Sequence, residues 1–152
     1  MISLFRIDDR LIHGQVAMAW SKAANADIII AVDKTAANDQ LQKMALLLAK
    51  PSGVEAKIID PKDFGKTYQE VKESKVMVVV GNPIDASKIV KELKGKENFD
   101  INLGNLKSGD NKEKISGSIY VTPEEKSALE EIKKDGFKIY IQGTPTSKKD
   151  FY

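Results

Sequence analysis

The sequence predicts an open α/β fold, with a mainly parallel sheet of about six to seven strands and helices on both of its faces. The first observation behind this prediction is that short, β-branched apolar runs alternate with amphipathic helical segments over about 100 residues, as in chains of βαβ units. The second is a length of 152 residues with no linker, repeat or low-complexity segment. That length is typical of one domain, so we expect residues 1–152 to form a single domain.

The chain begins with an apolar strand followed by a helix. Residues 2–7 form a short apolar run, which predicts the first strand. Apolar side chains then recur at helical spacing, which predicts a helix over residues 12–24. Residues 27–32 are again continuously apolar after the first position, so we expect a second, buried strand there.

The second helix and third strand follow the same order. Residues 41–49 carry apolar side chains at helical spacing, which predicts a helix with Asn38 or Thr35 available as its N-cap. A proline, a serine and a glycine end this helix. Residues 54–59 then predict the third strand.

Two further helices flank the most apolar strand of the chain. A helix is expected over residues 61–74, with a proline at or near its first position, where the missing N–H costs nothing. The continuous β-branched run at 76–80 is typical of a strand buried on both faces. Residues 83–93 predict the next helix, again opened by a proline, and 99–103 predict the fifth strand.

The pattern changes in the last third of the chain. Residues 107–114 are polar and rich in turn formers, and residues 115–121 predict an extended segment. The run Thr122–Glu125 then opens a helix, because it supplies a threonine cap, a proline at the first position and two acids in the first turn. A last strand is expected at 137–141, followed by a polar tail.

Composition excludes several classes of function. The chain has no cysteine and one histidine, so thiolate zinc sites and histidine-rich metal sites are excluded. A carboxylate site for magnesium or calcium stays open in principle, but no aspartate-rich calcium loop occurs, and we expect neither a cofactor nor a resident metal. The net charge of +2 and the aromatic content of 7% argue against nucleic-acid binding. The N-terminus lacks the pattern of a signal peptide, and the longest apolar run is too short to span a bilayer. We therefore expect a cytoplasmic protein.

The single histidine, His13, lies just past the first strand and at the start of the first helix. In parallel α/β sheets, ligands and chemistry lie beyond the carboxyl ends of the strands. The N-terminus of the helix offers unpaired N–H groups to an anion, Gly14 allows a bulky anion to approach the backbone, and Arg10 has a planar fork that suits phosphate oxygens. Together with a neutral imidazole, these groups predict a site that accepts and passes on a phosphoryl group.

The two aspartates before Arg10 have different expected roles. Asp8 or Asp9 could accept a hydrogen bond from one ring nitrogen of His13, which would fix the tautomer and leave the other nitrogen free to attack. The second aspartate is expected to cap the first helix. The alternative for His13 itself is an ordinary polar side chain, since neither a Walker pattern nor G-x-G-x-x-G occurs in the chain.

Other residues expected at the same edge are weaker candidates. Asn82 could donate a hydrogen bond to phosphate, or it could form a structural turn before a proline. Lys34 could attract an anion, although a solvated loop lysine is the better explanation. Gln15 could contact a partner or lie on the helix surface. Leu11 and Ile12 either contact a partner or anchor the loop to the core.

The segment Phe5–Val16, F-R-I-D-D-R-L-I-H-G-Q-V, resembles the active-site signature of the IIB components of the mannose/fructose/sorbose class of the sugar phosphotransferase system. The string is long and rich in specific polar residues. One position pair departs from the family, because Asn105 and Leu106 stand where a glycine and a methionine are common. The resemblance extends over nearly the whole chain, through Trp20, Lys43–Ala45, Asn82–Ala86, Ile101–Asn105, Ser116–Glu125 and the region of Pro145.

This resemblance implies specific roles and partners. His13 matches the histidine that accepts phosphate from a phosphorylated IIA partner and passes it to the sugar imported by the membrane subunits IIC and IID. Arg10 matches the arginine that stabilises the transferred group, and Asp8 matches a supporting carboxylate. The resemblance also implies one antiparallel edge strand and a location at the membrane transporter without insertion. The transported sugar and the oligomeric state stay open.

Two alternative functions are compatible with the residues alone. In a receiver-like signalling module, Asp60 at the end of the third strand would form an acyl phosphate beside the acids that end the first strand, with magnesium bound. A separation of 51 residues between Asp9 and Asp60 is long for that arrangement, and a helix start explains Asp60 adequately. A structural subunit that binds a phosphorylated metabolite without turnover is the third possibility.

Overall fold

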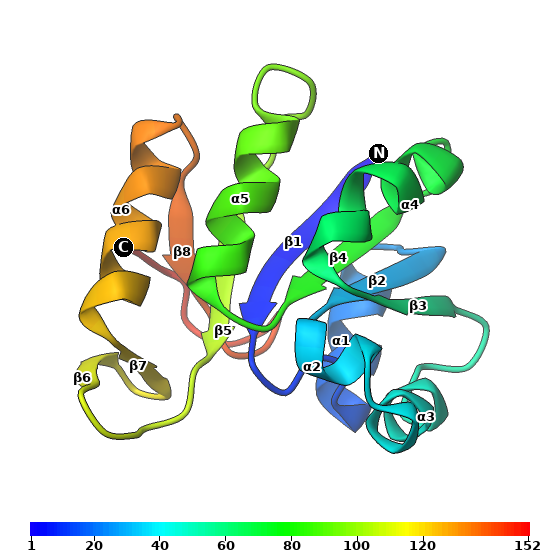
Figure 1. Cartoon of the computed structure of the whole chain (residues 1–152), viewed down its shortest axis with the longest axis horizontal. Helices are drawn as coiled ribbons and strands as arrows, with labels where there is room; N and C mark the ends of the chain where they lie inside the picture. Colours follow the sequence, from blue (N-terminus) through cyan, green and yellow to red (C-terminus); the bar gives the residue numbers. More distant parts are fainter.

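Seven strands form one sheet in the order β3-β2-β4-β1-β5-β8-β9 in the computed structural model, which describes all residues 1–152. All pairings are parallel except β8 with β9, so the predicted mainly parallel sheet with one antiparallel edge strand is confirmed. Figure 1 shows β1 near the middle of the molecule. The strands are β1 (Ile2–Asp8), β2 (Ile28–Val32), β3 (Glu55–Ile59), β4 (Val76–Val80), β5 (Ile101–Asn105), β8 (Ile139–Ile141) and β9 (Asp150–Phe151).

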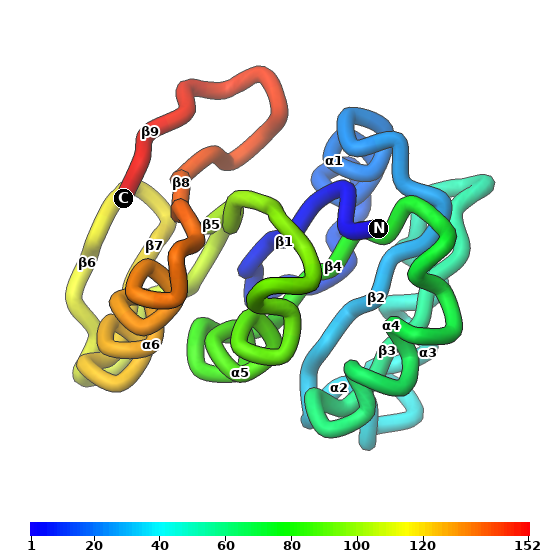
Figure 2. Tube along the Cα trace, turned by 90° about the horizontal axis from the view of Figure 1, so that it is seen from above, coloured from blue at the N-terminus to red at the C-terminus, as the bar shows by residue number.

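Helices cover both faces of the sheet, as predicted, and each face has its own apolar core. One core joins the strands to α4, α5 and α6 through side chains such as Phe64, Ile89 and Leu129. The other joins them to α1, α2 and α3 through Trp20, Ala36 and others. Figure 2 shows α1 on the opposite side of the sheet from α5 and α6. The helices are α1 (Gly14–Ala23), α2 (Lys34–Ala37), α3 (Gln40–Leu48), the 3₁₀ turn η1 (Pro61–Asp63), α4 (Phe64–Val71), α5 (Pro83–Leu93) and α6 (Pro123–Lys134).

Strand β1 lies at the point where the connections change face. The chain leaves β1 through α1 on one face, whereas α5 carries it from β4 to β5 across the other face, and both strands pair directly with β1. In α/β sheets of this kind, the carboxyl edge at such a point is where ligands bind. None of the helices is long and apolar enough to cross a bilayer.

The helix starts differ from the predictions where several polar residues compete to cap. Asp39 caps α3 by accepting hydrogen bonds from two backbone N–H groups, so the prediction of Asn38 or Thr35 as the cap is wrong. Asp33 caps the additional short helix α2, which places Lys34 in a helix and not in a loop. Aspartate competes well for these positions because its side chain accepts strongly from free N–H groups.

The segment after β5 is folded more tightly than the sequence predicts. Residues 115–121 are not one extended segment but the end of β6 (Glu113–Ser116), a turn and β7 (Ile119–Val121), which pair as an antiparallel hairpin. The polar tail contains β9, whose two residues pair with β8. Both differences involve strands of two to four residues, too short for an alternating pattern to be visible.

Candidate functional site

His13 occupies the N-cap position of α1, in the loop that follows β1. Its side chain is exposed and makes no capping hydrogen bond, so both ring nitrogens are free of the protein. Leu11 and Ile12 are 6% and 3% exposed, which shows that they anchor the loop to the core. Leu11 has a φ of 60° and Gly14 a φ of 39°, so the backbone adopts the left-handed region on both sides of His13.

The Asp8 carboxylate is buried beside this loop and is bonded to two arginines. Its Oδ1 accepts from the backbone N of Arg10 at 2.9 Å and from Arg10 Nε at 3.0 Å. Its Oδ2 accepts from Arg10 Nη2 at 2.8 Å and from Arg6 Nη2 at 2.9 Å. Asp8 therefore holds Arg10 from one side, and the hydrogen bonds that Arg10 donates to Asp8 raise the pKa of Arg10 further above its usual value.

Arg6 lies beneath this pair and is the site residue for which the sequence suggests no role. Its side chain is 1% exposed, and burial lowers its pKa from the usual value while Asp8 partly restores it. The guanidinium donates to Asn102 Oδ1, on the neighbouring strand β5, and stacks over the ring of Trp20 at 5.1 Å. One signal was available in the sequence: a charged residue in the middle of a strand that is otherwise apolar.

Asp9 fixes a different part of the site. Its carboxylate accepts from Asn105 Nδ2 at 2.9 Å and from the backbone N of Lys107 at 2.8 Å, so it ties the β1–α1 loop to the segment after β5. The prediction that Asp9 caps the first helix is therefore wrong, because His13 holds that position. No hydrogen bond joins the His13 ring to Asp8 or Asp9, since both carboxylates are occupied elsewhere.

The weaker candidates take structural positions around the same edge. Asn82 caps α5: its Oδ1 accepts from the backbone N of Asp85 at 2.9 Å, and its Nδ2 donates to the Asp85 carboxylate at 2.8 Å. Gln15 is exposed on the first turn of α1.

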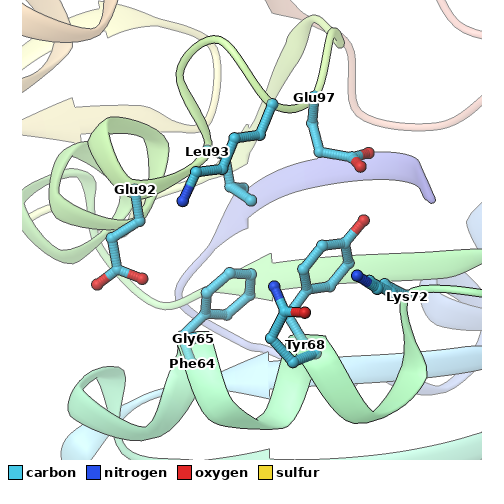
Figure 3. A pocket seen from close by; sticks show the side chains of 9 residues that line it. Phe64, Gly65, Tyr68, Lys72, Glu92, Leu93 and Glu97 are labelled. Atoms are coloured by element: carbon cyan, nitrogen blue, oxygen red, sulfur yellow. The ribbon is translucent and has the colours of Figure 1, made fainter.

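A pocket of about 250 Å³ between α4 and the end of α5 contains none of the residues of the β1–α1 loop (Figure 3).

Asp60 is distant from the acids that end β1. It follows the edge strand β3, and both β2 and β4 lie between that strand and β1. Its carboxylate accepts from the backbone N of Lys62 at 3.0 Å, which caps η1 and holds the pKa of Asp60 below its usual value. The acidic pocket of a receiver is therefore not assembled here.

The arrangement at the end of β1 suits transfer of an anionic group. An exposed imidazole stands at a helix N-terminus, with a fixed guanidinium three residues away in the chain. Asp8 uses Arg10 Nε and Nη2, so the remaining N–H groups of the fork, including those of Nη1, stay available to an anion. Charge stabilisation and positioning of this kind are what phosphoryl transfer requires of a protein.

Comparison with known proteins identifies the family. Residues 2–151 match the family described as the sorbose subfamily IIB component of the PTS system, the sugar phosphotransferase system. A probable phosphotransferase enzyme IIB component of Streptococcus pyogenes serotype M6 is 33% identical over 137 residues, covering 87% of this chain and 84% of that protein. The mannose-specific EIIAB component of Escherichia coli is 30% identical over 151 residues, 98% of this chain but 46% of that longer protein.

A solved structure supports the same assignment. The IIBSor domain of the sorbose permease from Klebsiella pneumoniae superposes with a TM-score of 0.91 at 28% sequence identity, covering 98% of this chain and 91% of that domain. The chain therefore belongs to the sorbose subfamily of IIB components and is a phosphotransferase of the sugar phosphotransferase system.

Proposed function

We propose that His13 is the residue that carries the phosphoryl group in this IIB component. A ring nitrogen of His13 attacks the phosphorus of a phosphohistidine on a IIA partner, so that a new N–P bond forms as the donor's N–P bond breaks. In the second transfer, a sugar hydroxyl attacks the same phosphorus, and His13 leaves as free imidazole while the hydroxyl proton is released. The observation that carries this proposal is the exposed, unbonded imidazole in the same loop as a fixed arginine, in a chain with no other histidine.

The neighbouring residues have distinct proposed roles. Arg10 stabilises the charge on the transferred oxygens through the N–H groups that Asp8 leaves free. Asp8 orients Arg10 and does not touch the phosphoryl group, because its carboxylate is buried. Gly14 lets the oxygens approach the first free N–H groups of α1. Asn82 is the weakest candidate for a phosphate contact, since its side chain already caps α5.

The family supports a proposal for the partners. IIB components work within the phosphotransferase system, together with IIA and membrane-embedded components. The EIIAB name of the Escherichia coli relative indicates that a IIA part and a IIB part share one chain there, which supports a IIA protein or domain as the donor for this chain. We propose that the chain docks peripherally on the IIC and IID subunits, where the sugar arrives.

Labelling by a phosphorylated IIA partner tests the proposal. The wild-type chain should acquire one phosphate that is labile in acid and stable in base, as expected of phosphohistidine. The variant His13→Ala should acquire none while keeping its circular dichroism spectrum and thermal unfolding temperature. Labelling that survives this substitution, or a phosphate that is labile in base and needs magnesium, would contradict the proposal and favour an acyl phosphate.

A further inference from the structure

Both arginines of the chain meet at one carboxylate. Among 24 basic residues only Arg6 and Arg10 are arginines, and both donate to Asp8. Every other basic residue of the chain is a lysine, including those of the other eight ion pairs. Arginine differs from lysine in its rigid planar fork, which fixes a carboxylate in one orientation. The use of arginine at this place alone indicates that geometry, and not only charge, matters there.

Arg6 cannot touch a phosphoryl group. Its side chain is 1% exposed, and its guanidinium also donates to the carbonyl oxygens of Gln142 at 3.2 Å and Gly143 at 3.3 Å. On β5, Gly104 lies so close that a Cβ added there would stand 2.2 Å from Arg6 Cζ. Strand β5 and the loop after β8 therefore enclose the guanidinium and leave it no freedom to reach His13.

The enclosed guanidinium fixes Asp8 instead. Arg6 donates to Oδ2 of Asp8 from both Nε, at 3.3 Å, and Nη2, at 2.9 Å. This leaves Oδ1 for the backbone N and the Nε of Arg10, and Oδ2 also receives Arg10 Nη2. Arg10 is itself 32% exposed, so its orientation depends on the buried carboxylate that it grips.

We propose that Arg6 is a positioning residue for phosphoryl transfer, which acts through Asp8 to hold Arg10 in the orientation that stabilises the phosphoryl group on His13. The inference rests on the proposed function of His13 and Arg10. Without Arg6, the buried carboxylate has only the half-exposed Arg10 as its ionic partner, and it turns toward water. The hydrogen bonds from Arg10 Nε and Nη2 to Asp8 are then lost. The net charge of positions 6, 8 and 10 falls from +1 to zero.

The Nε–H groups provide a direct test on the unphosphorylated protein. Because the chain has two arginines, its nuclear magnetic resonance spectrum contains two arginine Nε–H signals, assignable from the variants themselves. The variant Arg6→Met should remove the Nε–H signal of Arg6. It should also broaden the Nε–H signal of Arg10 or move it to the chemical shift of a solvent-exposed arginine. The control Ile7→Ala removes an adjacent buried side chain that packs into the opposite core, and the Arg10 signal should persist.

The kinetics of phosphate acceptance test whether the two arginines act as one unit. Arg6→Met and Arg10→Met should each slow labelling by a phosphorylated IIA partner by about tenfold or more, and the double variant should be no slower than Arg10→Met alone. Ile7→Ala should be labelled at close to the wild-type rate. An Arg10 signal that is unchanged in Arg6→Met, or single effects that multiply in the double variant, would overturn the inference.

A second variant tests the inference even if Arg6→Met does not fold. Gly104→Ala leaves all charged side chains in place but puts a Cβ where the Arg6 guanidinium lies, so it should also disturb the Arg10 signal and slow labelling. A normal Arg10 signal and a normal labelling rate in Gly104→Ala would count against the inference. Failure of this inference can be distinguished from failure of the proposed function. If His13 is not the phosphate carrier, His13→Ala is still labelled. If Arg6 does not position Arg10, the arginine signals show it in protein that carries no phosphate.

Discussion

At the scale of single residues, Asp8 is the position on which most of the site depends. Its carboxylate is 1% exposed and is the ionic partner of an equally buried Arg6. Asp8→Asn keeps the shape but removes the charge, and breaking a buried pair in this way costs about 3 kcal/mol. Urea unfolding of Asp8→Asn should therefore show a large loss of stability. Asp9→Asn is the matched control, and it should lose clearly less because Asp9 is partly exposed and pairs with no cation.

Gly14 is the second residue whose geometry is testable. Its φ of 39° is unfavourable for a side chain, although a Cβ there would meet no atom within 4 Å. Gly14→Ala should therefore cost about 1 kcal/mol through backbone strain alone, and it should slow phosphorylation by moving the first N–H groups of α1. Gly117→Ala is the control: it also has open space but no positive φ, so its stability and labelling should match the wild type.

The residues of the site were predictable from the sequence only where the signal is local. His13, Arg10 and Asp8 stand within six consecutive positions, and the topology places that segment at the carboxyl edge. Arg6 gave no comparable signal, because its partners on β5 and in the loop after β8 are more than 90 positions away in the chain. The prediction for Asp9 is wrong for the same reason, since its partners, Asn105 and the backbone N of Lys107, are also more than 90 positions away.

At the scale of elements, helix α6 shows a cap that the sequence predicts correctly. Thr122 Oγ1 accepts from the backbone N of Glu125 at 3.1 Å, and the Glu125 carboxylate accepts from the backbone N of Thr122 at 2.9 Å. Thr122→Ala removes half of this reciprocal pair and should cost about 1 kcal/mol in urea unfolding. Ser127→Ala, at an exposed position inside the same helix, should change stability by less than about half of that.

A helix start is predictable from the sequence where all nearby capping residues favour one position, and not where several of them compete. The threonine, proline and two acids that open α6 all favour one start, and the helix begins there. Before α3, by contrast, four residues within the seven positions 33–39 can cap, and the outcome is two helices with aspartate caps. The short strands β6, β7 and β9 each pair with a partner strand. The presence of that partner cannot be predicted from the local strand propensity of so few residues.

Helix α4 provides a pH-dependent prediction. Tyr68 is 5% exposed, its hydroxyl has no hydrogen-bond partner, and it lies at the pocket shown in Figure 3. Burial, and then the neighbouring Glu97, raise its pKa above the usual value of a tyrosine. Above about pH 10 the unfolded chain therefore releases this proton while the folded chain keeps it, so stability falls as the pH rises toward the folded pKa.

Tyr68→Phe tests this linkage. The variant should lose less stability than the wild type between about pH 9.5 and 11.5 in urea unfolding. Part of the decline should persist, because burial also raises the pKa of Tyr140 and Tyr152. At neutral pH the variant should be as stable as the wild type or slightly more so, since the hydroxyl that it lacks has no partner to lose. An identical alkaline decline in both proteins would contradict this account of Tyr68.

At the scale of the whole molecule, the order of the strands decides which acidic residues can act together. Asp8 ends the strand that lies between β4 and β5, whereas Asp60 follows β3 at the edge of the sheet. The sequence places both at the carboxyl ends of strands, but strand order depends on contacts between distant segments and is not visible in any local pattern. Two acids that look equivalent along the chain therefore differ in environment: one is buried between arginines, and the other caps a 3₁₀ turn.

This difference yields a prediction that separates histidine from aspartate phosphorylation. Asp60→Asn should be labelled by a phosphorylated IIA partner at the wild-type rate and should lose at most about 1 kcal/mol, because asparagine also caps well. Asp8→Asn should be labelled at least about tenfold more slowly, since Arg10 then lacks its anchor. The measurement is the initial rate of labelling at equal concentrations of folded protein. Loss of labelling in Asp60→Asn with normal labelling in Asp8→Asn would reverse the assignment, and would require the phosphoryl group to be accepted at the edge of the sheet instead of at its centre.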